Sequence, residues 1–233
     1  MREILESGLR ELGLRPDERA VERFCGYYEY LDQRNRVMNL TAISGEEDVA
    51  RLHFLDCATL CTVADFKNAS VIDVGTGAGF PGLPVKILEP SVSLTLLDSL
   101  RKRVDFLSET CERLALTDVQ CLHVRAEEAD TSLRESYDYA VSRAVARLNV
   151  LCELCLPFVR LGGAFLAMKG PDCAEELSEA ENAIRLLGGQ VERIVPCAVP
   201  GIETRHCVAV IRKTAPSPAK YPRRFAKIQK EPL

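Results

Sequence analysis

Gly75, Gly77 and Gly79 lie in the segment DVGTGAGFPG, directly after a short β-branched run. A glycine turn between a strand and a helix lets the main chain approach a ligand closely, and the free N–H groups at the helix start favour an anion. Asp98 ends the next such run, 19 residues beyond Gly79. A carboxylate at that position accepts hydrogen bonds from ribose hydroxyls. The turn and Asp98 together predict a ribose-containing cofactor.

The glycine spacing separates two classes of cofactor. A dinucleotide-binding turn has the pattern G-x-G-x-x-G, which would put its third glycine at position 80, where this chain has Phe80. The observed G-x-G-x-G spacing favours a methyl donor. Asp98 would serve NAD equally well, so an NAD-dependent dehydrogenase is the first alternative, although no proton-transfer residue for it is recognisable. Asp98 as a plain turn residue before a helix is the simplest alternative.

Three further segments follow predicted strands at the same edge. Ala126 and Glu127 come after the third strand, where doubly wound proteins contact a nucleotide base. Arg143 follows the fourth strand and Lys169 ends the fifth, where reacting groups meet. We regard both as positioning candidates, and no residue is assigned as a catalytic acid, base or nucleophile. A single solvated Arg or Lys is the competing interpretation.

The loop after the fourth strand restricts the acceptor. Amine-methylating nucleic-acid enzymes carry Asp-Pro-Pro or Asn-Pro-Pro before an aromatic residue there, and this chain reads SRAV. Carbon-5 pyrimidine methylation needs a cysteine nucleophile, yet the only Pro-Cys, Pro196-Cys197, follows the sixth strand. An acceptor with an available lone pair, such as a purine ring nitrogen, remains. Such an acceptor needs alignment more than a general base.

The elements that position these residues follow from periodicity. Short β-branched runs alternate with helical stretches, which predicts an α/β, Rossmann-like fold with a seven-stranded, mostly parallel sheet and helices on both faces. The expected strands are 70–74, 93–98, 119–124, 137–142, 163–169, 190–195 and 206–213. We divide the chain into an N-terminal helical extension packed on the core, the core itself and a basic C-terminal tail, at 1–65, 66–213 and 214–233.

Two helices are expected in the extension. The first has Pro16 in its first turn, and apolar residues recur in it at helical spacing: Val21, Phe24, Tyr28 and Leu31. The second begins at a capping box formed by Ser44 and Glu47. Its expected inward face holds Val49, Leu52 and Leu55.

Charge is unevenly distributed. The net charge is −4, but seven basic residues and one acid lie from position 212 onward, so this end carries +6 and leaves −10 for the rest. Because phosphate backbones are bound chiefly by Lys and Arg, we expect the tail to fold back and frame a pocket for RNA. The expected RNA contacts are Arg143, Lys169, Lys220, Arg223, Arg224, Lys227 and Lys230.

The tail has two competing interpretations. Three prolines between positions 216 and 222 predict an extended or irregular segment, so it could be a solvated, disordered terminus. Alternatively, it packs as structure through its apolar residues Tyr221, Phe225, Ile228 and Leu233. In the favoured interpretation cofactor binding does not depend on the tail, because the glycine turn, Asp98 and the Ala126–Glu127 edge all lie outside it.

The ten cysteines do not form a metal-binding pattern. Only Cys152 and Cys155 make a C-x-x-C, inside an apolar segment without a second pair or a clustered histidine. We therefore expect buried thiols in a reducing compartment and no metal. The chain has no apolar run of membrane-spanning length and no signal-peptide pattern, so we expect a soluble, unprocessed, cytoplasmic protein. We also expect it to be a monomer.

Ordered motifs along nearly the whole chain resemble the RsmG family, also called glucose-inhibited division protein B. They are NLTAI, RLHFLDC, DVGTGAGFPGLP, LLDSLRKRVDFL, RAEE, VSRA, MKG, RHCVAVIRK and KIQKEPL. The resemblance implies a class I methyltransferase that uses S-adenosyl-L-methionine to methylate nitrogen-7 of one guanine in 16S ribosomal RNA, presented free, in the 30S subunit or in an assembly intermediate. Two small departures from the family pattern are Cys57, where Ser is expected, and Ala78.

The resemblance also implies site residues. Cofactor contacts fall on Gly75, Phe80, Ala126, Glu127 and Arg143, and Gly77, Gly79 and Asp98 join them from the residue patterns above. A non-catalytic ribosome-binding factor with a vestigial pocket is a second alternative, since a fold alone does not establish activity. A methyltransferase acting on a small molecule is a third, but the basic tail would then have no evident purpose.

Overall fold

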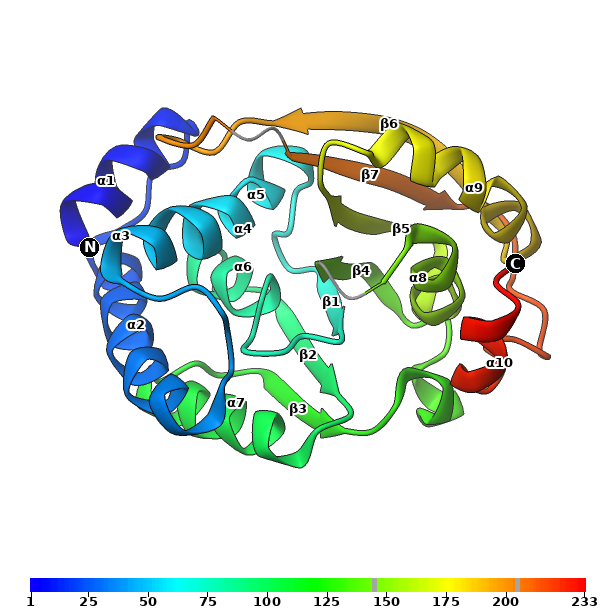
Figure 1. Cartoon of the computed structure of the whole chain (residues 1–233), viewed down its shortest axis with the longest axis horizontal. Helices are drawn as coiled ribbons and strands as arrows, with labels where there is room; N and C mark the ends of the chain where they lie inside the picture. The colour runs from blue at the N-terminus through cyan, green and yellow to red at the C-terminus, as the bar shows by residue number, and fades with distance from the viewer. Residues whose placement is uncertain (144–145, 204–205) are drawn as a thin grey trace.

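A computed structural model describes residues 1–143, 146–203 and 206–233. Seven strands form one sheet in the order β3-β2-β1-β4-β5-β7-β6 (Figure 1). Strands β1 to β5 all run parallel to one another, and β7 runs antiparallel to both β5 and β6. The predicted fold class is confirmed. The strands are β1 Ser70–Val74, β2 Ser93–Asp98, β3 Val119–His123, β4 Tyr137–Arg143, β5 Val159–Lys169, β6 Gly189–Cys197 and β7 His206–Lys213.

The strand order reverses between β1 and β4, and ligands of doubly wound folds bind outside the carboxyl ends of the strands at such a point. The helices precede, connect and follow the strands. They are α1 Arg2–Glu11, α2 Glu18–Met38, α3 Glu46–Val49, α4 Asp56–Ala58, α5 Leu60–Val63, α6 Gly82–Leu88, α7 Arg101–Arg113, α8 Leu148–Cys155, α9 Cys173–Leu186 and α10 Phe225–Lys230. A π-helical turn, Ala50–Leu55, joins α3 to α4.

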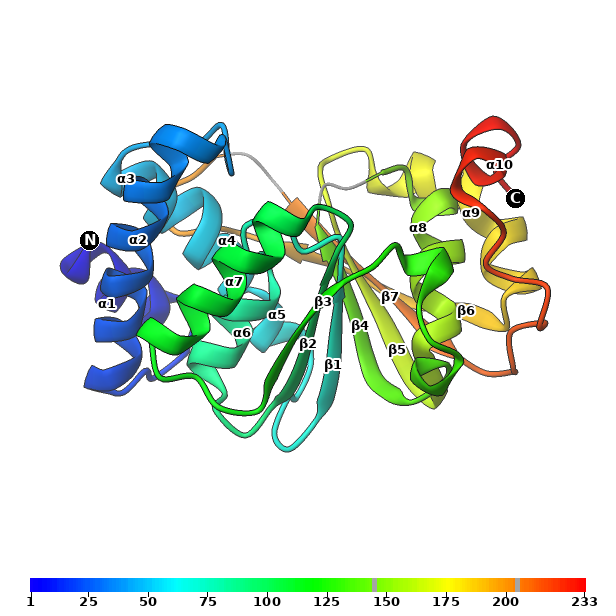
Figure 2. The same ribbon diagram turned by 90° about the horizontal axis from the view of Figure 1, so that it is seen from below.

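Alternating side chains of the strands serve two cores, because successive residues of a strand point to opposite faces. Val71 of β1 belongs to the core shared with α6, α7 and the N-terminal helices. Its neighbour Ile72 belongs to the core shared with α8, α9 and α10. Figure 2 shows these two groups of helices on opposite sides of the sheet. The central strands are therefore apolar on both faces, as parallel strands require.

The N-terminal helices pack directly on the core, since α2 contacts α6 and α7, and α1 contacts α2. Helix α2 begins after Asp17, whose side chain accepts a hydrogen bond from the Ala20 N–H. Asp17 therefore caps the helix, and the expectation that Pro16 lies in its first turn was wrong. Tyr28 is only half-buried, whereas Tyr27 is fully buried in the core. The inward face of α2 is thus rotated by one residue at this position.

The capping box at Ser44 does not form. Helix α3 starts at Glu46 after Gly45, which has φ of 90° and provides no side-chain cap. Of the three residues expected inward, Val49 and Leu55 are buried and Leu52 is half-buried. The remaining differences are at element ends. Strand β5 begins at Val159, four residues before the expected start, and β4 ends at Arg143.

Cys152 and Cys155 are buried thiols within α8, as predicted. Among residues 1–143, 146–203 and 206–233, no group of three or more His, Cys, Asp or Glu is placed to hold a metal ion. None of the helices in these ranges is long and apolar enough to cross a membrane.

Candidate active site

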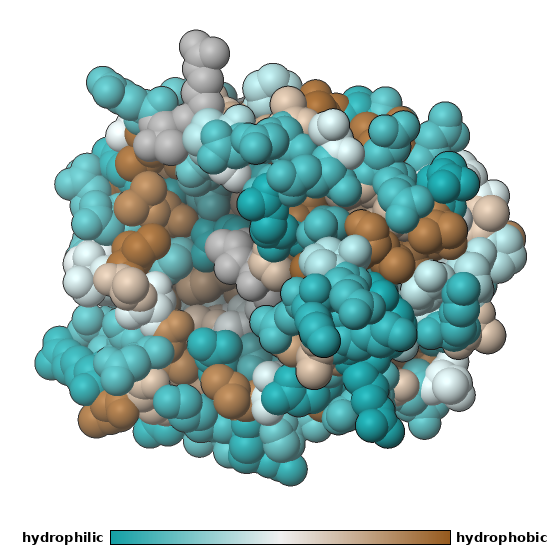
Figure 3. Space-filling model, turned by 45° about the vertical axis from the view of Figure 1, so that its right-hand side comes forward, coloured by the Kyte–Doolittle hydropathy of each residue, from teal (hydrophilic) through white to brown (hydrophobic). Residues whose placement is uncertain are grey.

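A cavity of about 430 Å³ opens at the point where the strand order reverses, and we call it the switch-point cavity. It collects residues from the ends of β1, β2, β3 and β4. In the space-filling view, a hollow is visible on a face that is otherwise largely hydrophilic (Figure 3). Seven predicted cofactor residues line the cavity: Gly75, Gly77, Phe80, Asp98, Ala126, Glu127 and Arg143. Gly79 does not line it.

Two glycines of the turn, Gly77 and Gly79, are needed for different reasons. Gly77 has φ of 62°, and a Cβ added there would contact nothing within 4 Å, so this part of the main chain faces open space. Gly79 has φ of 104°, and a Cβ there would lie 2.6 Å from the Tyr27 hydroxyl and 2.5 Å from Leu83. Gly79 is therefore required for packing of the turn against α2 and α6, whereas Gly77 leaves room for a ligand.

Buried Asp73 of β1 fixes the glycine turn through hydrogen bonds. Its Oδ2 accepts hydrogen bonds from the Thr76 hydroxyl at 2.7 Å and from the Gly82 N–H at 2.8 Å. Its Oδ1 is buried and has no hydrogen-bond partner within the described part of the chain. Burial raises the pKa of Asp73 to about 7, against the opposing effect of these two hydrogen bonds. The turn is thus fixed by a carboxyl group that does not itself line the cavity.

Asp98 is fixed with its carboxylate at the cavity wall. The side chain is 3% exposed. Oδ1 accepts from the Leu100 N–H at 2.9 Å, and Oδ2 accepts from the Gly77 N–H at 3.0 Å and from Arg103 at 3.4 Å. Because two carboxylate oxygens offer about four acceptor positions, capacity remains for a further donor. Asp98 therefore joins the glycine turn to the end of β2, and its predicted role in binding ribose stays a prediction. Arg103 is a lining residue that the sequence did not indicate.

Arg143 lies at one end of the cavity in a network of buried groups. Its Nη1 donates to the Leu52 carbonyl at 2.9 Å and to Asp56 Oδ2 at 2.8 Å. Its Nη2 donates to His53 Nδ1 at 2.7 Å. The guanidinium lies 5.0 Å from the centre of the Phe80 ring, on which His53 also stacks at 4.3 Å. The Arg143 charge is thus held beside Phe80 and compensated by Asp56.

The protonation of the two histidines follows from their partners. An arginine can only donate, so His53 Nδ1 accepts from Arg143 and the ring proton is on Nε2. Burial and the Arg143 charge lower the pKa of His53 to about 3, which keeps it neutral. His206, at the start of β7, lies 2.7 Å from Asp56 Oδ1, and this hydrogen bond raises the pKa of His206. Asp56 therefore bridges a permanent cation and a titratable one.

A second cavity of about 430 Å³ adjoins the first, and we call it the neighbouring cavity. The two share His53 and Arg143 as common walls. The other lining residues come from the N-terminal extension, the end of β5, α9 and the start of β7: Ile43, Leu52, Asp56, Met168, Lys169, Gly170, Glu176 and His206. The sequence analysis placed only Arg143 and Lys169 near this position, because the remaining contacts join segments about 90 to 150 residues apart.

Three of the cations expected to bind RNA are already paired. Lys169 is 7% exposed, and its Nζ lies 2.7 Å from Glu176 and donates to the Ala146 carbonyl. Arg223 forms a multiply hydrogen-bonded ion pair with Glu153, and Arg143 is held by Asp56. These three cations are thus held by carboxylates of the protein itself, and their assignment as RNA contacts stays a prediction. The four exposed cations of the tail are Lys220, Arg224, Lys227 and Lys230.

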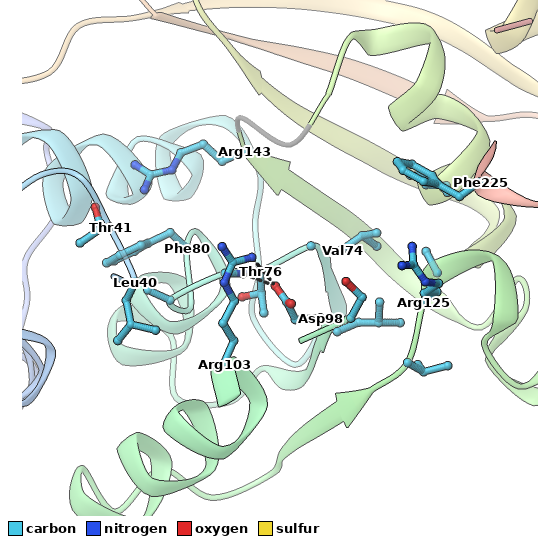
Figure 4. A pocket seen from close by; sticks show the side chains of 18 of the residues that line it. Leu40, Thr41, Val74, Thr76, Phe80, Asp98, Arg103, Arg125, Arg143 and Phe225 are labelled. Carbon is cyan, nitrogen blue, oxygen red and sulfur yellow. Dashed lines mark hydrogen bonds and ion pairs between the residues drawn. The ribbon is translucent and has the colours of Figure 1, made fainter. Parts of the chain in front are cut away.

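The C-terminal tail, residues 214–233, packs as structure. Tyr221 and Ile228 are buried, and the Arg134 guanidinium donates to carbonyl groups of the tail at 2.6 to 3.1 Å. Helix α10 brings Phe225 to the wall of the switch-point cavity, on the side of Arg125 (Figure 4). The tail thus contributes Phe225 to this cavity, a residue that the sequence expectation of tail-independent cofactor binding did not include.

Comparisons with known proteins place the chain in a family. A family model described as rRNA small subunit methyltransferase G matches residues 20–208. Proteins named ribosomal RNA small subunit methyltransferase G from Acetivibrio thermocellus and Alkaliphilus metalliredigens are 45% and 47% identical, over 100% and 99% of this chain and 97% and 98% of their own lengths.

Solved structures agree in fold. A SAM-dependent methyltransferase from Aquifex aeolicus superposes with a TM-score of 0.53 at 17% identity, covering 79% of this chain and 96% of that one. P. horikoshii TYW2 in complex with MeSAdo has a TM-score of 0.54 at 15% identity, covering 71% and 66%. At such identities the likeness concerns the fold alone. On the strength of the family model and the full-length relatives, the chain belongs to the rRNA small subunit methyltransferase G family.

Proposed function

We propose that this protein transfers the methyl group of S-adenosyl-L-methionine to nitrogen-7 of a guanine in 16S ribosomal RNA. The observation that carries the proposal is the pair of adjoining cavities that share His53 and Arg143. The switch-point cavity contains the glycine turn and the carboxylate of Asp98, which together suit a nucleoside cofactor. The other is large enough for a flat base and opens beside it. Family membership supports rRNA as the acceptor.

The residues of the switch-point cavity fit the cofactor. Gly77 leaves open space over the main chain, and Asp98 would accept from a ribose hydroxyl. The base would lie at the end of β3, against Ala126 and Glu127 and beside Phe225. Since ribose joins the base to the methionyl group, the methionyl end would lie on the opposite side of Asp98, toward Phe80 and Arg143. Figure 4 shows where these two side chains lie.

This chain's residues contribute alignment and exclusion of water. When bound, the cofactor supplies a methyl group on a positively charged sulfur. Guanine nitrogen-7 carries a lone pair and no proton, so the nitrogen–carbon bond forms and the sulfur–carbon bond breaks without a general base. Apolar Ile43, Leu52 and Met168 line the neighbouring cavity, and neutral His53 adds no charge that would repel the reacting centre. No single acid or base is expected to be indispensable.

The acceptor is a polyanion, and the exposed tail cations support its approach. Lys220, Arg224, Lys227 and Lys230 lie on the segment that carries Phe225 to the cavity wall, so phosphates near these cations would lie near the site as well. We propose that the substrate is 16S rRNA, free or within the 30S subunit or its assembly intermediate, and that the enzyme acts as a monomer. We also propose that the chain consists of three parts: an N-terminal helical extension, a core and a C-terminal tail, at 1–65, 66–213 and 214–233.

Methyl transfer to purified components tests the proposal. Tritiated S-adenosyl-L-methionine would be offered with unmethylated 30S subunits, with naked 16S rRNA and with guanosine. We expect incorporation into RNA and recovery of 7-methylguanosine by nuclease digestion and mass spectrometry. Methylation at another atom would refute the nitrogen-7 assignment. Cofactor binding without any methyl transfer would favour a ribosome-binding factor, and binding of NAD in its place would favour a dehydrogenase.

A further inference from the structure

Thr41 lies in the link between α2 and α3, at the end of the switch-point cavity opposite Phe225 (Figure 4). Asn35 of α2 clamps this link. Its Oδ1 accepts from the N–H groups of Leu40 at 2.7 Å and Thr41 at 2.9 Å, and its Nδ2 donates to the Thr41 carbonyl at 2.9 Å. The backbone of Thr41 is therefore fixed before any ligand arrives, which lowers the entropy that binding would cost.

The hydroxyl of Thr41 has one unused hydrogen bond, and that bond is a donor. Oγ1 accepts from the Ile43 N–H at 3.1 Å. It also accepts from His53 Nε2 at 2.8 Å, because the proton of this neutral ring is on Nε2. A hydroxyl has two lone pairs and one proton, so both acceptor positions are filled. No acceptor for the proton occurs in residues 1–143, 146–203 and 206–233, which leaves it for a ligand in the cavity.

The hydrogen bonds behind Thr41 all point the same way. Arg143 donates to His53, and His53 donates to Thr41. Each bond in such a chain polarises the next and makes the last donor stronger. The chain begins at a buried guanidinium and ends at the cavity wall, so the group favoured there is an anionic oxygen.

We propose that Thr41 binds the carboxylate of the cofactor's methionyl group. The inference rests on the proposed function, since the nucleoside cofactor oriented by Asp98 puts its amino-acid end at this side of the cavity. Among the functional groups of that end, the carboxylate alone can accept a hydrogen bond from a donor while carrying negative charge. Thr41 lines the switch-point cavity but not the neighbouring one, so it is assigned to the cofactor and not to the guanine.

Calorimetric titration with three ligands tests this assignment. S-adenosylmethionine and S-adenosylhomocysteine carry the carboxylate, and 5′-methylthioadenosine lacks the whole amino-acid group. Thr41→Val removes the hydroxyl and keeps the shape. Because Thr41→Val removes a hydrogen bond to the charged carboxylate, we expect the Kd values of the first two ligands to rise about tenfold or more. The Kd of 5′-methylthioadenosine should change less than about twofold, within the usual effect of a substitution outside a contact.

Two further variants control for structural effects. Thr41→Ser keeps the hydroxyl and should restore most of the lost affinity. Ser44→Ala changes an exposed hydroxyl of the same link and should leave all three Kd values unchanged. Equal weakening of all three ligands by Thr41→Val would mean a disturbed pocket, and no weakening of any would mean no contact. Either result overturns the assignment while the wild type still binds. If the wild type binds none of the ligands, the proposed function itself fails.

Discussion

Replacing Arg223 by alanine should release the C-terminal tail, whereas the same replacement of its neighbour Arg224 should not. Arg223 donates through Nε and Nη2 to both oxygens of Glu153 at 2.6 to 3.2 Å, and its backbone N–H donates to the same carboxylate at 2.8 Å. Arg224 is exposed. The two arginines therefore separate the effect of a lost buried ion pair from that of a lost surface charge.

The magnitude follows from burial. Glu153 is 0% exposed and the Arg223 side chain is 17% exposed. Removing one partner of a buried ion pair costs about 3 to 5 kcal/mol, because the remaining charge is left without compensation. The tail can limit this cost by detaching, which lets water reach Glu153 but exposes Tyr221 and Ile228. Exposing two such side chains costs about 3 to 6 kcal/mol. The two routes are similar in cost, so we expect a loss of about 3 kcal/mol.

Urea unfolding followed by circular dichroism measures the loss, and brief trypsin treatment shows where it occurs. Arg223→Ala should be cut rapidly at Lys220, Arg224 and Lys227, whereas Arg224→Ala should resist cleavage and stay within about 0.5 kcal/mol of the wild type. If Arg223→Ala matched Arg224→Ala in both stability and resistance, the ion pair would not be what holds the tail, and the reasoning from burial would be refuted.

Four other predictions concern the cofactor, the turn and RNA. Asp98→Ala should raise the Kd of S-adenosylmethionine about tenfold or more in calorimetry; unchanged affinity would contradict the ribose assignment. Phe225→Ala should weaken S-adenosylmethionine and 5′-methylthioadenosine by similar factors, and a loss confined to the former would argue against a nucleoside contact. Burial raises the pKa of Asp73 to about 7, above its unfolded value, so its stabilising contribution is present below about pH 4 and is lost as the pH rises toward 7. Wild type should therefore lose more unfolding free energy between pH 5 and pH 8 than Asp73→Asn, and parallel losses would contradict this. Neutralising the four exposed tail cations together should reduce the salt dependence of RNA binding by about 3 in log–log slope while cofactor affinity persists, and an unchanged slope would exclude them as RNA contacts; they are Lys220, Arg224, Lys227 and Lys230.

The sheet and the glycine turn could be predicted because their signals are local. A β-branched run followed by glycines has few alternatives to a strand and a turn, and the carboxylate of Asp98 needs only a fixed spacing from that turn. The ends of elements were less accurate. At Ser44 the sequence satisfies the capping-box pattern, but Gly45 takes the cap position with a positive φ, and a local pattern cannot distinguish these two geometries.

The walls of the two cavities could not be predicted in the same way. His53, Asp56 and His206 are brought to Arg143 by packing of the N-terminal extension and β7 against the edge of the sheet. For the same reason, the sequence cannot separate paired cations from exposed ones. Arg223 and Arg224 are equivalent in a sequence, and only the position of Glu153 on α8 decides that one is buried in an ion pair while the other is exposed to solvent.

The antiparallel direction of β7 puts a length constraint on the end of the chain. Because β7 starts at the edge that holds the cavities, it finishes at Lys213 on the opposite edge, and the chain must return along the height of the sheet to deliver Phe225. A strand of eight residues rises about 24 Å over its seven steps. The residues between Lys213 and Phe225 can span at most about 40 Å when extended. We call these residues the tether. Deleting four of them would reduce the maximum span to about 26 Å, which is barely more than the height of the strand and leaves almost no extra length for the contacts of the tether with Arg134. Tether length alone would then decide whether Phe225 reaches the cavity.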